Sequence, residues 1–166
     1  YTVPVKVFKN EKFIQSSAWN LGIKESSGDI ILTVSAHSFI DNSYVKRCVY
    51  YLQKTEASNV GGPMLVDGKG YIGKIIEFVH HSFFGLGGGH FHDKNFEGYV
   101  DTVFNGAWHK EVFNEIGLFD ERLVRNQDIE FSARLRQNNG RVYLTPKLRS
   151  YYHCRDTLKG LWNQNF

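Results

Sequence analysis

The fold is decided by the stretch Ile30-Ile31-Leu32-Thr33-Val34-Ser35-Ala36-His37. Its first five residues are apolar or β-branched and have the length of a strand, a pattern typical of a strand buried on both faces of a sheet. In an α/β sheet, ligands bind beyond the carboxyl ends of the strands, and residues 35–37 fall there. The stretch therefore predicts a central strand and a ligand site at its end.

The segments on either side of this strand alternate between extended and helical patterns. We predict strands at residues 3–8, 59–66, 102–104, 142–144 and 148–152, and helices at 13–24, 43–55, 71–81, 110–116 and 126–138. Strands that alternate with helices indicate an α/β domain with a largely parallel sheet. The length of 166 residues suits one domain, spanning 1–166, with a hydrophobic core.

Acidic, amide and basic side chains concentrate between Phe119 and Arg136, where a loop is predicted to enter a helix. Asn126 is the expected N-cap, and Gly140 follows the predicted end of the helix. Asp128 then falls in the first turn, where the helix dipole favours a negative charge. An ionised carboxylate at this position could take a proton from a hydroxyl group. The alternative is an acidic first turn that only stabilises its helix.

His37 follows the Ile30–Val34 strand, and His153 ends the predicted strand at 148–152. Two imidazoles together with phosphate oxygens would suit Mn²⁺ or a similar ion. The alternative is that His37 is a hydrogen-bonding loop residue.

The charge distribution argues against nucleic acid as a partner. The net charge is only +3, and acidic residues interleave with the arginines at 122, 125, 134, 136 and 141. Small anionic ligands such as a nucleotide diphosphate remain compatible with this balance.

The two cysteines, Cys48 and Cys154, lie far apart and lack metal-ligand spacing. Cys48 shares a predicted helical face with apolar residues, so we expect a buried free thiol and a reduced, cytoplasmic setting. No signal peptide and no long apolar run is visible in the sequence.

Taken in order along the chain, the short motifs resemble the family 2 inverting glycosyltransferases, in particular the bacterial exopolysaccharide, succinoglycan-type branch. The likeness spans nearly the whole chain. The motifs are Asn20-Leu21-Gly22-Ile23, Ser27-Gly28-Asp29, Ser35-Ala36-His37, Gly61-Gly62, Gly85–Gly88, Tyr99–Val103, Gly106-Ala107, Ile116–Glu121, Gln127–Glu130 and Arg134–Arg136.

The resemblance implies a GT-A fold with a Rossmann-like mixed sheet and transfer of a sugar from a nucleotide donor, with inversion at the anomeric carbon. It places the family's acidic motif on Gln127-Asp128, with Asp128 as general base. It places the family's metal motif on Ser35-Ala36-His37, with Mn²⁺ or Mg²⁺ as cofactor. Ser35 stands where the family normally has Asp, and the lost carboxylate predicts weaker metal binding.

The resemblance also suggests softer roles for four residues. Asn20 would lie near the donor diphosphate, Asp101 would line the acceptor side, and Arg155 would offset diphosphate charge. Gln164 is similar to part of an acceptor-binding signature. The alternatives are ordinary ones: a helix-surface amide for Asn20 and a backbone-bonding carboxylate for Asp101.

The start of the chain resembles the family's third strand, so we expect the first βαβ unit to be missing and the carboxyl end to be truncated. A sheet without that unit would expose an edge, which association of two copies could cover. We expect the covered chain alone to be inactive, and its parent to act on a saccharide or lipid-linked saccharide, at the inner face of the cell membrane. The alternative function is a non-catalytic binding module, marked by Ser35.

Overall fold

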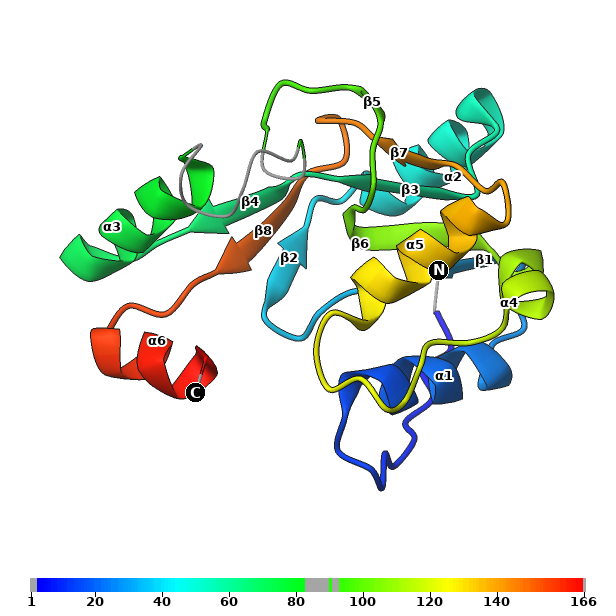
Figure 1. The fold of residues 1–166 in the computed structure, drawn as a ribbon, viewed down its shortest axis with the longest axis horizontal. Coiled ribbons are helices and arrows are strands. Elements are labelled where there is room, and N and C mark those ends of the chain that lie inside the picture. The colour runs from blue at the N-terminus through cyan, green and yellow to red at the C-terminus, as the bar shows by residue number, and fades with distance from the viewer. Residues whose placement is uncertain (1–2, 83–89, 91–92, 166) are drawn as a thin grey trace.

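The computed structural model describes residues 3–82, 90 and 93–165, and it shows two β-sheets with helices packed around them (Figure 1). The strands are β1 (Ile30–Leu32), β2 (Ser38–Ile40), β3 (Asn59–Gly62), β4 (Met64–Asp67), β5 (Gly98–Tyr99), β6 (Phe104–His109), β7 (Val142–Leu144) and β8 (Ser150–His153). The helices are α1 (Gln15–Glu25), α2 (Tyr44–Thr55), α3 (Gly70–His81), α4 (Glu111–Ile116), α5 (Gln127–Gln137) and α6 (Leu158–Asn165). This arrangement confirms the predicted α/β class.

The larger sheet has the strand order β1-β6-β3-β7-β5, and the smaller has β2-β8-β4. The prediction of a largely parallel sheet was wrong, because β6 lies between β1 and β3 and runs antiparallel to both. The parallel pairs among the described strands are β3 with β7 and β4 with β8. The sheets are therefore mixed.

Four of the predicted strands were wrong in extent, and in place of the one at 102–104 the structure has β6, which begins at Phe104 and runs to His109. Residues 59–66 form two strands in different sheets, because Pro63 cannot donate a ladder hydrogen bond and the chain changes sheet there. Residues 3–8 form no strand, and the side chains of Val3, Val5 and Val7 are 77% to 92% exposed. An alternating apolar pattern becomes a strand only where a partner strand supplies the hydrogen bonds.

The stretch Ile30–Val34 is also shorter and more exposed than predicted. Its strand ends at Leu32, Ile31 is the buried residue of β1 with 8% of its surface exposed, and Val34 is 41% exposed. Among the described strands, β1 pairs with β6 alone, so β1 is an edge strand.

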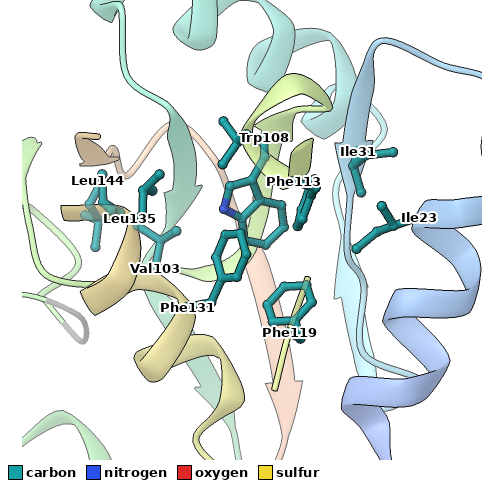
Figure 2. Packing of buried hydrophobic residues seen from close by; sticks show 11 residues of the cluster. Ile23, Ile31, Val103, Trp108, Phe113, Phe119, Phe131, Leu135 and Leu144 are labelled. Atoms are coloured by element: carbon teal, nitrogen blue, oxygen red, sulfur yellow. The ribbon is translucent and has the colours of Figure 1, made fainter. Parts of the chain in front are cut away.

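A core with a cluster of aromatic rings at its centre, which we call the aromatic core, fills one face of the larger sheet. Trp108 from β6, Phe113 from α4, Phe119 from the following loop and Phe131 from α5 pack with ring centroids 4.5 to 6.1 Å apart (Figure 2). Phe131 is completely buried. This packing places the first turn of α5 beside the ends of β1 and β6.

The other face of the larger sheet is covered by α2. Tyr44, Cys48 and Leu52 of that helix pack on Val60 and Ala107, which point away from the aromatic core because side chains alternate along a strand. Cys48 is buried and free, as predicted. In the described part of the chain, no helix has both the length and the apolar character needed to cross a membrane.

Candidate active site

A cavity of about 340 Å³ opens where the carboxyl end of β1, the start of β6 and the first turn of α5 meet. The smaller sheet and α3 close its other side through Met64, Tyr152 and His80. Its remaining lining residues are Gln15, Trp19, Thr33, Ser35, His37, Val103, Phe104, Asn105, Gly106, Trp108, Val124, Arg125, Asn126, Gln127, Asp128 and Ser132. Four predicted site residues, namely Ser35, His37, Gln127 and Asp128, thus share one cavity.

Asp128 is half-buried in the first turn of α5. Burial raises the pKa of its carboxyl group, and the backbone N–H groups of Asp128 and Ile129 oppose that rise by stabilising the charged form. Burial is the larger effect, so the carboxylate binds a proton more readily than a free aspartate does. A more basic carboxylate that faces a cavity suits the role of proton acceptor.

The turn that leads into α5 differs from the predicted capped start. Asn126 lies at the N-cap position, but its backbone is left-handed with φ of 60° and its side chain makes no capping hydrogen bond. Asn tolerates this conformation better than most residues. The end of the helix follows the prediction, with Asn139 at φ of 63° and the Gly140 N–H donating to the Leu135 carbonyl at 2.9 Å.

Gln127 is buried next to Asp128, with 4% of its surface exposed. Its Nε2 donates to Gln15 Oε1 of α1 at 2.7 Å. Its Oε1 has no hydrogen-bond partner among the described residues, although it is buried and Gln127 lines the cavity. A ligand hydroxyl could donate to this oxygen, which would offset the cost of leaving it unpaired.

Asn105 organises the loop that carries Ser35 and His37. Its Oδ1 accepts from the Ser35 backbone N–H at 3.2 Å, and its Nδ2 donates to Ser38 Oγ at 3.1 Å. The hydroxyl of the fully buried Tyr44 donates to the Asn105 carbonyl at 2.8 Å. Asn105 therefore ties the end of β1 to β6 and α2.

The backbone of Asn105 is strained in a way that explains its placement. Its φ is 49°, and the β3–β6 pairing shifts register between Val60 and Gly62, opposite this point. Such a bulge re-aims a side chain out of the regular alternation. The pair Asn105-Gly106 inside an apolar strand pattern is the sequence signal that could have identified it.

His37 lines the cavity, with its ring centroid 5.1 Å from that of Tyr152. Burial, and secondly the positive charge of Arg155, lower the pKa of His37. The neutral imidazole is the form that can act as a metal ligand.

His153 lies outside the cavity lining, although its backbone N–H donates to the His37 carbonyl at 3.4 Å. Its Nδ1 lies 3.1 Å from Asp67 Oδ2. In the part of the chain that the structure describes, no group of three or more His, Cys, Asp and Glu side chains could hold a metal ion. His37 and His80 are the imidazoles that line the cavity among the described residues.

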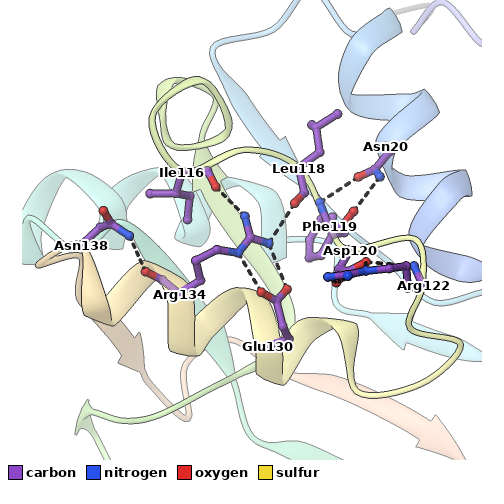
Figure 3. Close-up of polar contacts among 9 residues, drawn as sticks. All are labelled: Asn20, Ile116, Leu118, Phe119, Asp120, Arg122, Glu130, Arg134 and Asn138. Atoms are coloured by element: carbon purple, nitrogen blue, oxygen red, sulfur yellow. Dashed lines mark hydrogen bonds and ion pairs between the residues drawn. The ribbon is translucent and has the colours of Figure 1, made fainter.

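Asn20 does not line the cavity; it joins α1 to the loop before α5 (Figure 3). Its Nδ2 donates to the Phe119 carbonyl and to Glu121 Oε1, both at 2.9 Å, while its Oδ1 accepts from the Phe119 N–H at 3.0 Å. These bonds occupy the amide, so its role in this structure is to position the loop.

Arg134 braces the same loop from the side of α5 (Figure 3). Its guanidinium donates to Glu130 at 2.7 and 2.9 Å and also to the carbonyls of Ile116 and Leu118. The fork geometry of arginine suits this several-fold contact. The loop and the first turns of α5 are thereby held as one unit.

The other predicted site residues lie apart from the cavity. The side chain of Asp101 is 84% exposed and lies 2.9 Å from Arg136 Nη1. Arg155 is exposed and outside the cavity lining, but its charge acts on His37. The side chain of Gln164 and the Gly85–Gly88 loop lie outside the described residues.

Sequence reasoning missed several lining residues besides Asn105. Arg125 is a cation among the lining residues, Gln15 accepts a hydrogen bond from Gln127, and Trp19 and Met64 supply apolar walls. Their elements contact the cavity only through tertiary packing, and no local pattern marks them.

Comparison with known proteins identifies related sequences. The model of the family described as glycosyl transferase family 2 matches residues 1–117, and Asp128 falls beyond that match. A curated relative from Methanococcus voltae is 26% identical over 162 residues, which cover 93% of this chain and 50% of the relative. It is named dolichyl N-acetyl-alpha-D-glucosaminyl phosphate 3-beta-D-2,3-diacetamido-2,3-dideoxy-beta-D-glucuronosyltransferase. The chain spans about half the length of this relative.

Solved structures of S. aureus TarS share the fold. Residues 1–349 of TarS align with a TM-score of 0.58 at 15% identity, over 88% of this chain and 42% of that chain. The same protein in complex with UDP-GlcNAc aligns with a TM-score of 0.52 at 14% identity, over 86% of this chain and 39% of that chain. The predicted GT-A fold is thereby confirmed.

Proposed function

The chain belongs to glycosyl transferase family 2, and from this premise we propose that it takes part in the transfer of a sugar from a nucleotide-sugar donor to a hydroxyl acceptor, with inversion at the anomeric carbon. The observation that carries the proposal is the meeting of Asp128, Ser35 and His37 in one cavity. A carboxylate and an imidazole then line the same cavity from different elements. In an inverting transfer the acceptor attacks one side of the anomeric carbon and the leaving group departs from the other, so both sides need a functional group.

Asp128 is the general base in this proposal. The acceptor oxygen attacks the anomeric carbon as its proton passes to the Asp128 carboxylate, and the bond from that carbon to the diphosphate oxygen breaks. The raised pKa of Asp128 supports the role, because a base whose pKa lies nearer the working pH drives proton transfer more effectively. The rigid attachment of α5 to the aromatic core keeps the carboxylate in position.

His37 and Arg155 form the donor side. His37 would ligate a Mn²⁺ or Mg²⁺ ion that the diphosphate oxygens also bind, and such an ion would neutralise charge on the leaving group. The lowered pKa of His37 supports its role as a neutral ligand, while Ser35 brings no carboxylate. Arg155 adds positive charge near His37, which would offset diphosphate charge. His153 would support this side through its backbone bond to His37.

The acceptor and the biological setting are the finer part of the proposal. The Methanococcus voltae relative is named for a dolichyl phosphate-linked substrate, and TarS has been solved with UDP-GlcNAc and with UDP. We propose a UDP-sugar donor and a saccharide or lipid-linked saccharide acceptor, in exopolysaccharide or cell-surface biosynthesis at the cytoplasmic face of the membrane. Asp101, exposed beyond the cavity, would contact the acceptor.

A second candidate is a non-catalytic module that binds a nucleotide sugar. The observation that favours it is Ser35, since the neutral hydroxyl removes a negative charge from a site meant for a divalent cation. Both candidates bind the nucleotide-sugar donor, but the transferase is expected to need Mn²⁺ for this binding and the non-catalytic module is not.

The deciding experiment is a calorimetric titration with UDP-sugars, with and without Mn²⁺. Metal-dependent binding that His37→Ala removes supports the transferase. If the affinity for the UDP-sugar is the same with and without Mn²⁺, and no sugar is transferred to an acceptor, the non-catalytic module is supported. If a folded sample binds no nucleotide sugar at all, both candidates are wrong.

A further inference from the structure

A second cavity, of about 380 Å³, lies beside the loop that joins β7 to β8. Its charged lining residues are Lys94, Lys147 and Arg149, and no carboxylate lines it within the described part of the chain. Its remaining lining includes Asn95 and the apolar surfaces of Leu65 and Tyr151. We call it the basic cavity.

The basic cavity and the active-site cavity lie on opposite faces of the smaller sheet. Along β4, Met64 lines the active-site cavity and Leu65 the basic cavity; along β8, Tyr152 and Tyr151 divide in the same way. Leu65 and Tyr151 are paired positions in the β4–β8 register. Because successive side chains of a strand point to opposite faces, the sheet itself separates the two cavities.

No acid of the described residues contacts the positive charges of the basic cavity. Among the described residues, none of Lys94, Lys147 and Arg149 forms an ion pair. The charge of Lys94 contributes to lowering the pKa of Glu77, after the larger effects of the Lys74 and Gly68 hydrogen bonds. The Glu77 carboxylate accepts from Lys74 at 2.7 Å and from the Gly68 N–H at 3.0 Å.

The backbone beneath two of these cations is firmly held. Lys147 and Arg149 flank Leu148, which is fully buried and whose N–H donates to the Thr145 carbonyl at 3.1 Å. Arg47 donates to the Lys147 carbonyl at 2.6 Å, and the Asp41 N–H donates to the Arg149 carbonyl at 3.4 Å. Lys147 and Arg149 therefore extend from the same short segment, whose backbone is held in place. A backbone that is already ordered loses less conformational entropy when a ligand binds.

Close packing at Gly62 adds to this bracing. A Cβ on Gly62 would come within 1.7 Å of the Leu148 carbonyl oxygen. The end of β3 thus lies directly against the segment that carries both cations.

We propose that the basic cavity binds a phosphate group carried on an apolar or ring-shaped body. Arg149 can donate two parallel hydrogen bonds to phosphate oxygens, while Lys147 and Lys94 supply further charge. Leu65 and Tyr151 offer apolar contact for the body of the ligand. The phosphate belongs to a soluble phosphorylated compound or to a lipid headgroup, and the test separates these sources.

The first arm titrates the ¹⁵N-labelled protein with inorganic phosphate at constant ionic strength and follows amide shifts by NMR. We expect saturable shifts at Asn95, Lys147 and Arg149. The double variant Lys147→Gln/Arg149→Gln should bind phosphate about tenfold more weakly or worse, since each charged hydrogen bond contributes strongly. The matched control, Lys6→Gln/Lys46→Gln, loses the same charge from exposed positions elsewhere and should bind as the wild type does.

The second arm measures co-sedimentation with vesicles of phosphatidylglycerol in phosphatidylcholine and of phosphatidylcholine alone. Preference for the anionic vesicles that is lost in the Lys147→Gln/Arg149→Gln variant identifies a lipid headgroup. Equal sedimentation with both vesicles, together with saturable phosphate shifts, identifies a soluble ligand. The proposal is overturned if neither arm depends on Lys147 and Arg149. The spectrum of the double variant reports directly whether its fold is retained.

Discussion

The two walls of the active-site cavity are built in different ways. The wall that carries Asp128 rests on the aromatic core of Trp108, Phe113, Phe119 and Phe131 and is braced by the Asn20 and Arg134 hydrogen bonds. The wall that carries His37 leads into β2 of the short, three-stranded sheet. Packing there is lighter, and Phe39 of β2 is 59% exposed.

This difference separates two kinds of task. A general base must keep its position relative to the reacting carbon within a fraction of an ångström, and a dense core supplies that rigidity. In the proposed reaction, the His37 wall must admit and release a large anionic substrate, which light packing permits. The loop of Ser35 and His37 is held by hydrogen bonds, among them those of the buried Asn105 and the bond from the His153 N–H to the His37 carbonyl.

The largest expected effect distinguishes the chemical roles of the walls. Asp128→Asn should lower the rate of transfer by about 10²- to 10⁴-fold, because the acceptor loses its base, while UDP-sugar affinity stays close to wild type. His37→Ala should instead weaken Mn²⁺-dependent donor binding. Rates with labelled donor and calorimetric affinities measure both variants. Substantial turnover by Asp128→Asn would show that the assignment of the base is wrong.

The next effect compares how firmly the walls are packed. Phe131→Ala should lower the free energy of unfolding by about 3–5 kcal/mol, because it removes a completely buried ring and leaves a cavity. Phe39→Ala, in the lightly packed wall, should cost about 0.5 kcal/mol or less, in the range of ordinary surface substitutions. Urea denaturation of both variants tests the contrast, and equal costs would contradict it.

A smaller effect tests whether Asn105 positions the donor loop. Asn105→Gly keeps the left-handed backbone free of strain but loses the bonds to Ser35 and Ser38, at a cost of about 1–3 kcal/mol. Asn105→Ala should cost roughly 1–2 kcal/mol more, because a Cβ is strained at that φ.

The readout for positioning is kinetic. Asn105→Gly should raise KM for the donor and leave the acidic limb of the pH profile unchanged, since Asp128 lies on the other wall. A change in stability with no change in KM would give Asn105 a purely structural role.

The smallest effect is a pH dependence of stability. The native pKa of Asp128 is raised above the ordinary value of 3.8. Between the two values the native state keeps a proton that the unfolded state has lost, so stability falls as pH rises through this window. Asp128→Asn does not titrate, and its stability relative to wild type should therefore increase with pH across the same window. Denaturation curves at several pH values between about 3.5 and 7 measure this trend.

Local patterns predicted helices well and sheet pairing poorly. The helix from 126 to 138 was found as α5 because its spacing and its Asn139-Gly140 stop are encoded within a few residues. The strand predicted at 3–8 was not found, although its alternation is regular, because pairing depends on a partner that the segment itself does not specify. The same limit explains the antiparallel position of β6 between β1 and β3.

The sequence by itself determined the α/β class and the family resemblance, and it marked Ser35, His37, Gln127 and Asp128 as candidate site residues, since each sits in a motif of short range. Only the tertiary structure decided that these residues share one cavity, that Asn20 holds the loop before α5, and that Asn105 holds the loop of Ser35 and His37. Motifs record the chemistry of a residue and its immediate neighbours. Burial, pKa and hydrogen-bond partners depend instead on segments far away in the chain, which meet only when the core packs.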